Sequence, residues 1–138
     1  MEQMAESFFE DTRLAGIVAP IRDYHFCWQL NRLFHFDFRL NTDIEIKLTK
    51  KLIRFSFSVF EYPEPGSSLV HYIYNNKHNG EYLLPEFKHN DYIWLMKGDA
   101  VDDGKFEHIS RSIRQIGGVQ MVAEITHEKI LHKNNLMF

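Results

Sequence analysis

The sequence predicts one α+β domain, a mostly antiparallel sheet of about five to seven strands with two main helices packed on one face. Several segments alternate apolar and polar residues, which is typical of strands buried on one side. Two others place apolar residues at helical spacing; one follows the first predicted strand and one precedes the last. This order favours ferredoxin-like β-α-β halves with extra hairpin strands between them. The length of 138 residues suits one core, so we expect a single domain over residues 1–138.

The first quarter of the chain is expected to contribute an arm, a strand and a helix. Residues 1–12 are expected to form a short helix or a loose arm, and residues 14–19 (LAGIVA) form an apolar run of strand length. A helix is predicted over residues 24–34, with Asp23 as its N-cap. Cys27 is expected to be a small buried residue rather than a nucleophile. The buried stripe of this helix is predicted to comprise Phe26, Leu30, Leu33 and Phe34.

Alternation is clearest in the middle of the chain. Residues 36–40 and 44–48 are predicted to form a hairpin through a turn at residues 41–43. Residues 53–60 alternate again and are predicted to form one strand. Prolines, glycine and serines in residues 63–68 predict a turn.

The second half is expected to complete the sheet. A strand is predicted over residues 69–74 and a polar loop over residues 75–80. The nearly continuous apolar run of residues 92–96 (YIWLM) predicts a strand buried on both faces, at the centre of the sheet. A helix over residues 105–116, capped by an aspartate of the preceding loop, leads into a last strand over residues 119–125.

Composition and charge exclude several classes of protein. With 16 basic and 19 acidic residues the net charge is −3, so we expect no DNA partner. No apolar run approaches the roughly 20 residues of a membrane span, so we expect no membrane partner. The single cysteine, Cys27, excludes a disulfide scaffold and fits a reducing compartment. Residues 1–11 hold four acidic residues and no basic one, the reverse of a secretory signal, so we expect a cytoplasmic protein.

Residues 84–92 (LPEFKHNDY) resemble the signature of the bacterial IPExxxVDY family. Residues 23–33 and 133–138 are also similar to that family. Leu84 stands where the family has isoleucine, and Asn90 where it has valine. The resemblance extends from about residue 13 to the end of the sequence. It implies a small soluble bacterial protein with no established activity, and it brings no catalytic or binding residues with it.

Pro85, Glu86, Asp91 and Tyr92 form the candidate site in this signature segment. Pro85 fixes its own φ and favours an extended residue before it, so the segment is expected to be a rigid entry to the strand that Tyr92 begins. The two carboxylates could form a pair for acid–base chemistry or for a divalent cation. Alternatively, each accepts backbone N–H groups or pairs with a base such as Lys88. We favour the structural interpretation, because the sequence places no third oxygen ligand.

No motif predicts a catalytic residue, a cofactor or a metal site, and an enzyme is the least supported class. The 8 histidines include no HExxH and no helical pair at i, i+4. The sequence also has no GxSxG, no phosphate-binding glycine loop and no GxGxxG. Asp99, Asp102 and Asp103 lack the spacing of a calcium loop and are expected to cap the following helix.

Two surface features suggest partners. One is a basic run beside alternating aromatic residues, comprising Lys47, Lys50, Lys51, Arg54, Phe55, Phe57, Tyr72 and Tyr74. On an open sheet such residues can bind single-stranded RNA, but the acidic net charge favours aromatics that face the core and lysines that protect an edge.

The other feature is the tail, residues 127–138, which is basic and then apolar. An apolar chain end either packs back onto its own domain or docks into a second subunit or partner. The candidate interaction residues of the tail are Asn134, Asn135, Leu136, Met137 and Phe138.

The sequence therefore favours a non-enzymatic domain that acts as a scaffold or through protein–protein contact. Its partner would be an unidentified protein or a second copy in a homodimer. The first alternative is a small-molecule regulatory domain, which would require a pocket holding Glu86, Asp91 or a histidine. Binding of single-stranded RNA is less supported.

Overall fold

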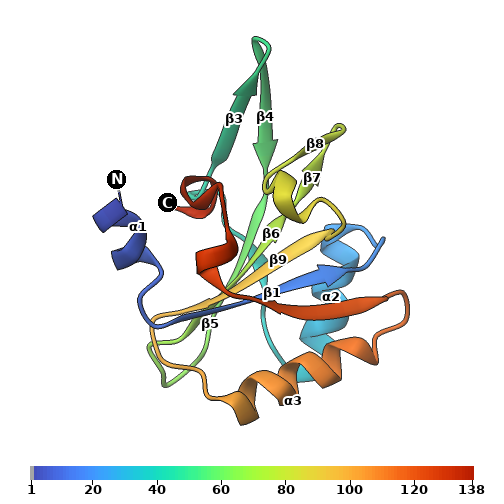
Figure 1. Ribbon diagram of the computed structural model, residues 1–138. Coiled ribbons are helices and arrows are strands. Elements are labelled where there is room, and N and C mark those ends of the chain that lie inside the picture. Colours follow the sequence, from blue (N-terminus) through green and yellow to red (C-terminus); the bar gives the residue numbers. More distant parts are fainter. Residues whose placement is uncertain (1) are drawn as a thin grey trace.

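The computed structural model describes residues 2–138, and its fold is α+β, as the sequence predicts. A six-stranded antiparallel sheet with strand order β10-β1-β9-β6-β5-β2 forms the centre (Figure 1). Its strands are β1 (Thr12–Val18), β2 (Arg39–Leu40), β5 (Val59–Pro63), β6 (Val70–Asn75), β9 (Tyr92–Lys97) and β10 (Met121–Ile125). The α-helices are α1 (Glu2–Phe8), α2 (Asp23–Phe34) and α3 (Asp103–Arg114). Outside the main sheet are the hairpins β3 (Ile46–Lys50) with β4 (Ile53–Phe57) and β7 (Lys77–His78) with β8 (Glu81–Tyr82), and the 3-10 turns η1 (Pro85–Phe87), η2 (His127–Lys129) and η3 (Lys133–Leu136).

Strand β9 lies inside the sheet, between β1 and β6, and residues 92–96 are all buried. The predicted central strand is therefore confirmed. Strands β9 and β10 both pair antiparallel with β1, which lies between them, so β9, α3 and β10 form a split β-α-β unit. After α2, by contrast, the chain runs to β2 at the far edge and returns through β5 and β6.

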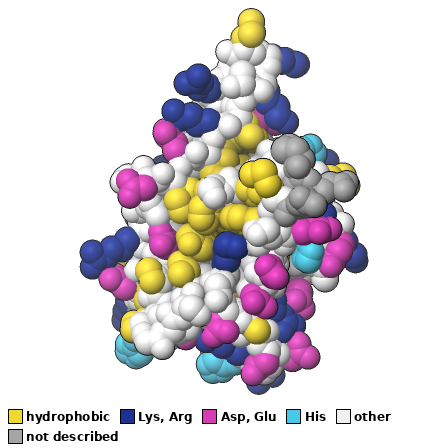
Figure 2. Space-filling view, turned by 90° about the vertical axis from the view of Figure 1, so that its left-hand side faces the viewer, with side chains coloured by type: hydrophobic (Ala, Val, Ile, Leu, Met, Phe, Trp, Pro, Cys, Tyr) yellow, Lys and Arg dark blue, Asp and Glu magenta, His cyan; other side chains and the backbone are white. Residues whose placement is uncertain are grey.

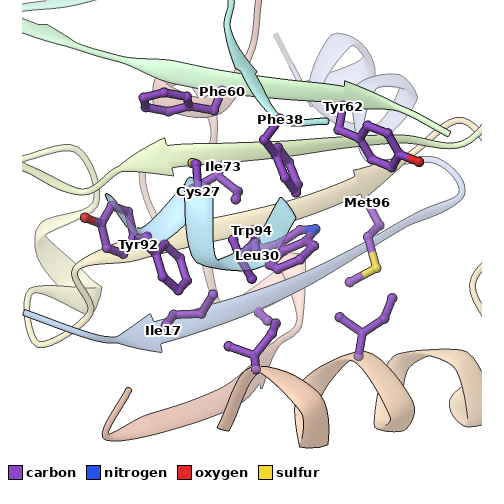
Figure 3. Close-up of a cluster of buried hydrophobic side chains, with 14 of the residues drawn as sticks. Ile17, Cys27, Leu30, Phe38, Phe60, Tyr62, Ile73, Tyr92, Trp94 and Met96 are labelled. Atoms are coloured by element: carbon purple, nitrogen blue, oxygen red, sulfur yellow. The ribbon is translucent and has the colours of Figure 1, made fainter. Parts of the chain in front are cut away.

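Helices α2 and α3 cover one face of the sheet, as predicted (Figure 1). Their apolar side chains meet those of the strands in one cluster around the fully buried Trp94 (Figure 3). The helices contribute Phe26, Cys27, Leu30, Phe106, Ile109 and Ile113. Helix α3 has the expected aspartate cap, because Oδ1 of Asp102 accepts a hydrogen bond from the N–H of Lys105 at 2.7 Å.

The opposite face is covered by segments with little regular structure. They come from the end of α1, the foot of the β3–β4 hairpin, the loop before η1 and the tail. Their buried residues are Phe9, Ile46, Phe57, Leu83, Leu84, Ile130 and Leu136. Figure 2 shows an apolar patch at the foot of the hairpin, beside the basic side chains that line the hairpin itself. The sheet is thus buried on both faces, although only one face has helical cover.

The beginning of α2 differs from the prediction. Asp23 is the first helical residue, and the N-cap position belongs to Arg22, whose side chain makes no capping hydrogen bond. Oδ1 of Asp23 instead accepts a hydrogen bond from the N–H of Tyr24 at 2.7 Å. Leu33, predicted on the buried stripe, is 42% exposed, whereas Cys27 is buried as expected.

The predicted hairpin between residues 36–40 and 44–48 is wrong. Only Arg39–Leu40 of the first segment is a strand, and it pairs with β5. Strand β3 pairs instead with β4, across a turn at Lys51 and Leu52. Both turn residues have positive φ (51° and 68°), a conformation usually signalled by Asn or Gly. Lys-Leu gives no such signal, so the pattern alone placed the hairpin one segment too early.

Two further boundaries differ. The strand predicted over residues 53–60 divides at Ser58, whose carbonyl accepts a hydrogen bond from the N–H of Asn75, and the chain passes there from the hairpin into the main sheet. Residues 75–80, predicted as a loop, include strand β7 and the positive-φ turn Asn79-Gly80, a dipeptide that favours such turns. Within residues 2–138 no helix combines the length and apolarity needed to traverse a lipid bilayer.

Candidate functional site

The signature segment, residues 84–92, is held against the sheet by one fully buried side chain, Asn76. Its Nδ2 donates hydrogen bonds to the carbonyls of Phe87 (3.0 Å) and Asn90 (2.9 Å). Its Oδ1 accepts one from the N–H of Leu84 at 2.8 Å. Asn76 is not among the residues predicted for this site, because an asparagine in a polar stretch of sequence gives no sign that it is buried. Here it satisfies three backbone groups of an irregular segment that has few ladder hydrogen bonds of its own.

Glu86, on η1, fastens the tail. Its Oε2 accepts hydrogen bonds from the N–H groups of Leu131 (2.6 Å) and His132 (2.8 Å), and its Oε1 lies 2.8 Å from Nδ1 of His132. Burial raises the pKa of Glu86. The hydrogen bonds from backbone N–H groups and from His132 together lower the pKa by more than burial raises it, so the net shift is downward. The carboxylate is thus an ionised anchor between η1 and the tail.

Asp91 and Tyr92 fasten the start of β9 to the chain that follows β1. Oδ2 of Asp91 accepts a hydrogen bond from the N–H of Ala19 at 2.7 Å, and its Oδ1 lies 3.1 Å from Nζ of Lys77. The hydroxyl of Tyr92 donates to the carbonyl of Ile21, and burial raises the pKa of that phenol. Both side chains therefore fix the backbone at the entry to the central strand.

The two signature carboxylates, Glu86 and Asp91, serve different contacts and do not act as a pair. Each accepts at least one backbone N–H and has its own basic neighbour, His132 or Lys77 rather than the expected Lys88. In the described part of the chain no three His, Cys, Asp or Glu side chains are grouped as a metal ion would require.

The tail packs onto its own sheet. Leu136 is fully buried, and its carbonyl accepts a hydrogen bond from the hydroxyl of Tyr74 at 2.7 Å. Nδ2 of Asn135 donates to the carbonyl of Leu83 at 2.8 Å. Of the two alternatives for the tail, the structure therefore has the one in which it packs on its own domain.

The end of the tail is less enclosed. The Phe138 ring lies 5.3 Å from the ring of Phe8, edge to face, and 4.9 Å from that of Tyr72, yet it is 52% exposed. Met137 is half-buried and Asn134 is exposed.

The aromatic side chains considered for RNA binding are largely covered. Phe57, Tyr72 and Tyr74 are buried in the apolar cluster on the sheet face opposite the helices, and Phe55 is partly buried against that cluster. Base stacking requires an open ring face, so these four residues do not form the exposed platform that RNA binding would need.

A buried polar network lies under the helical face, centred on His71. The indole N–H of Trp94 donates to Nδ1 of His71 at 3.1 Å, so Nε2 carries the proton and donates to Glu64 at 2.9 Å. Nζ of Lys105 donates to the same carboxylate at 2.9 Å. Burial lowers the pKa of His71 more than Glu64 raises it. Because the ring is fully buried, a substrate cannot reach it, and the network is structural.

The outer face of α2 presents aromatic and cationic side chains to solvent. Tyr24 is 63% exposed and Trp28 is 52% exposed. The guanidinium of Arg32 lies 4.9 Å from the centre of the Trp28 ring, and the His25 ring stacks with the Trp28 ring with centres 5.9 Å apart. We call Tyr24, Trp28, Arg32 and Leu33 the α2 surface. The sequence contains a signal for this surface, because residues 24, 28 and 32 recur at intervals of four and therefore share one side of the helix, away from its buried stripe.

A hollow of about 400 Å³ lies beside the α2 surface, where the ends of α2 and α3 meet. It is lined by Trp28, Gln29, Arg32, Leu33, Gln115, Ile116 and Gly117. Gln29 lines this hollow, while its Oε1 is buried away from solvent with no hydrogen-bond partner among the described residues. Trp28, Leu33 and Ile116 give the hollow an apolar lining, to which Arg32 adds a cation.

A second, more polar cleft of about 460 Å³ lies where α2 begins, next to Asp91. Its lining includes Arg22, Asp23, Lys77, His78 and Tyr92. It meets the condition set for a small-molecule site, a hollow that holds Asp91 and a histidine, although Lys77 and Asp91 already pair with each other.

In comparisons with known proteins, no family model, no curated protein and no solved structure matches this chain.

Proposed function

We propose that this protein is a non-enzymatic interaction domain that binds a protein partner through the α2 surface. The observation that carries this proposal is the exposure of Tyr24, Trp28 and Arg32 together on one helix. Tryptophan, tyrosine and arginine are the residues that most often dominate binding energy in protein interfaces. The resemblance of residues 84–92 supports placing the protein in the IPExxxVDY family, and with the single Cys27 it supports a bacterial cytoplasmic location.

The α2 surface is rigid because the opposite side of the helix is buried against the sheet. Phe26, Cys27 and Leu30 are buried against the sheet, and the Phe26 ring stacks on Tyr92 with centres 4.7 Å apart. A surface that is ordered before binding loses little conformational entropy on association. The signature residue Tyr92 therefore supports the proposed interface from inside.

The chemistry of the hollow indicates the kind of partner. Trp28, Leu33 and Ile116 provide apolar walls, and Arg32 provides a cation with no carboxylate within ion-pair distance in the described residues. A partner segment that inserts an apolar side chain and carries an acidic group would match both features. We therefore propose an acidic, apolar-anchored segment of another protein as the ligand.

Affinity capture with variants of the full chain tests the proposal. Bait carrying Trp28→Ala or Arg32→Glu is compared with wild type in an extract of the native cell. The matched control is Leu131→Ser, because Leu131 is also an exposed apolar residue (79%) but lies on the tail. We expect a partner retained by wild type and by the control and lost with both α2 variants. Equal recovery by all four baits would contradict the proposal.

The cleft beside Asp91 supports a second candidate, a small-molecule regulatory domain. Arg22 and His78 line this cleft, and neither makes an ion pair within residues 2–138, so they could contact a polar metabolite. A thermal-shift screen of charged metabolites, with Arg22→Ala as comparison, tests it. Stabilisation of wild type but not of the variant would favour this candidate, and no shift with any compound would remove it.

A further inference from the structure

The β3–β4 hairpin differs in charge from the rest of the chain. Residues 46–57 hold four of the 16 basic residues, Lys47, Lys50, Lys51 and Arg54, and none of the 19 acidic ones. The hairpin projects from the body of the molecule, with basic side chains along its length and an apolar tip (Figures 1 and 2). The remaining residues carry the whole of the acidic excess.

The apolar side chains of the hairpin become more exposed from its foot to its tip. The facing pair Ile46 and Phe57 is buried at the foot, whereas Leu52 is 98% exposed and Ile53 is 58% exposed at the tip. The positive φ of Lys51 and Leu52 fixes the tip as a tight two-residue turn. Lys51 has no ion-pair partner among the described residues. The hairpin is therefore a preformed basic arm whose apolar end has no cover.

A cleft of opposite charge, lined by carboxylates, lies near the foot of this arm. Its volume is about 650 Å³, and three carboxylates, Asp37, Asp43 and Glu61, contribute to its lining. Its one lining cation, Arg39, is paired with Asp37 at 3.0 Å. Leu40, which is 52% exposed, gives the cleft an apolar wall at the edge of the main sheet. We call this hollow the acidic cleft.

We propose that the occupant of the acidic cleft is the hairpin tip of a second copy of this chain. Asp43 lies three residues before Ile46, the first residue of β3, so the cleft adjoins the foot of the chain's own hairpin. When two copies lie with their hairpins side by side and antiparallel, each tip reaches the foot of the other. The contact is reciprocal, as two-fold symmetry requires, and it closes into a dimer instead of a filament. Lys51 would then meet Asp43 and Glu61, and Leu52 would cover Leu40.

The molecule favours a second copy over other anionic partners. An anionic bilayer would attract the lysines and accept the tip, but it would leave the acidic cleft exposed beside the lipid phosphates. A nucleic acid would have to separate stacked bases to admit Leu52, at a cost of a few kcal/mol per step. The chain itself offers both the charge and the apolar wall that the tip lacks.

Sedimentation equilibrium of the full chain tests the proposal. We expect a monomer–dimer equilibrium that shifts to monomer as salt rises, because exposed charge pairs are screened. Leu52→Ser should weaken the dimer on the order of tenfold, while the matched control Leu131→Ser leaves it unchanged. Monomer throughout in low salt would overturn the proposal, as would a dimer that Leu52→Ser leaves intact.

A charge exchange identifies the contact itself. Lys51→Glu and Asp43→Lys should each weaken the dimer, and the double variant should restore it. Cysteine pairs give an independent answer, because the only native thiol, Cys27, is buried. Mixing Leu52→Cys with Leu40→Cys should yield a disulfide-linked dimer under mild oxidation. Failure of both the restoration and the cross-link would overturn the proposal, as would a Leu52-dependent association of monomers with phosphatidylserine vesicles or duplex DNA.

Discussion

The two faces of the central sheet are both buried, but they are covered in different ways. Helices α2 and α3 cover one face with side chains from regular, contiguous elements. The other face is covered by pieces far apart in the sequence, from Phe9 to Leu136, and few of them are regular. A helix satisfies its own backbone groups, whereas irregular cover needs side chains to do so. Asn76, Glu86 and Tyr74 perform that task here.

This difference gives the signature segment and the tail a physical role. Their polar residues hold the two segments together: Glu86 binds the backbone at residues 131–132, and Asn135 binds the carbonyl of Leu83, just before the signature segment. The two segments, joined by a hydrogen bond between residues 45 positions apart, therefore act as one structural unit. The helical face, which needs no such clamp, leaves the outer side of α2 free to carry an interface.

The largest effect is expected for removal of Asn76 from the irregular face, our name for the sheet face that is covered by irregular segments instead of helices. Asn76→Ala leaves the N–H of Leu84 and the carbonyl of Asn90 without a partner, whereas the Phe87 carbonyl keeps the N–H of Asn90, and it should lower the free energy of unfolding by about 3 kcal/mol. Asn31, on α2, makes two hydrogen bonds to the backbone of Phe38 and is only half-buried. Asn31→Ala should therefore cost about 1 kcal/mol. Urea unfolding checks both, and equal losses would show that the two faces do not differ in this respect.

The helical face should determine the first loss of stability in acid. Burial gives His71 a pKa below its ordinary value of about 6.5. The unfolded chain thus gains a proton that the folded chain does not, so stability present above about pH 6.5 falls as the pH drops toward the folded pKa. His71→Gln retains an acceptor for Trp94 and should cost about 2 kcal/mol at pH 7.5 while removing this slope. His108→Gln, at an exposed histidine, serves as the control. Urea unfolding from pH 7.5 to 5 measures both, and an unaltered slope in His71→Gln would rule out His71 as its source.

The sequence predicted the helical face well and the other face poorly. The stripes of α2 and α3 repeat every three or four residues, and the run at residues 92–96 is apolar throughout, so periodicity alone locates them. The hairpin at Lys51-Leu52 breaks the usual turn chemistry and was misplaced. Asn76 and His71 are polar residues buried by their tertiary contacts, and no local pattern predicts that. The carboxylates of the signature segment were found by resemblance, and their partners, residues 131–132 and Ala19, became visible only in the fold.

The irregular face should respond to acid at lower pH and to a smaller extent. The pKa of Glu86 lies below its ordinary value of about 4.3, so its contribution is present above that value and is lost as the pH falls through the folded pKa. Glu86→Gln should cost about 1 kcal/mol at pH 7 and flatten this part of the profile. The exposed Glu128→Gln serves as control. Amide exchange at residues 131–136 should quicken in Glu86→Gln before global unfolding, and unchanged protection there would refute the anchoring role.

The smallest effect on stability is expected on the outer side of α2, and its smallness separates an interface from a core. Trp28 is half-exposed and belongs to neither cluster of buried apolar side chains, so Trp28→Ala should change the free energy of unfolding by less than about 0.5 kcal/mol. Phe26→Ala, two residues away on the buried side, should cost about 3 to 5 kcal/mol. Urea unfolding of the two variants compares the faces of a single helix. A large loss of stability in Trp28→Ala would mean that the α2 surface stabilises the fold. A small loss, together with failure of the Trp28→Ala bait to capture the partner that wild type retains, would assign the aromatic residues of this surface to binding.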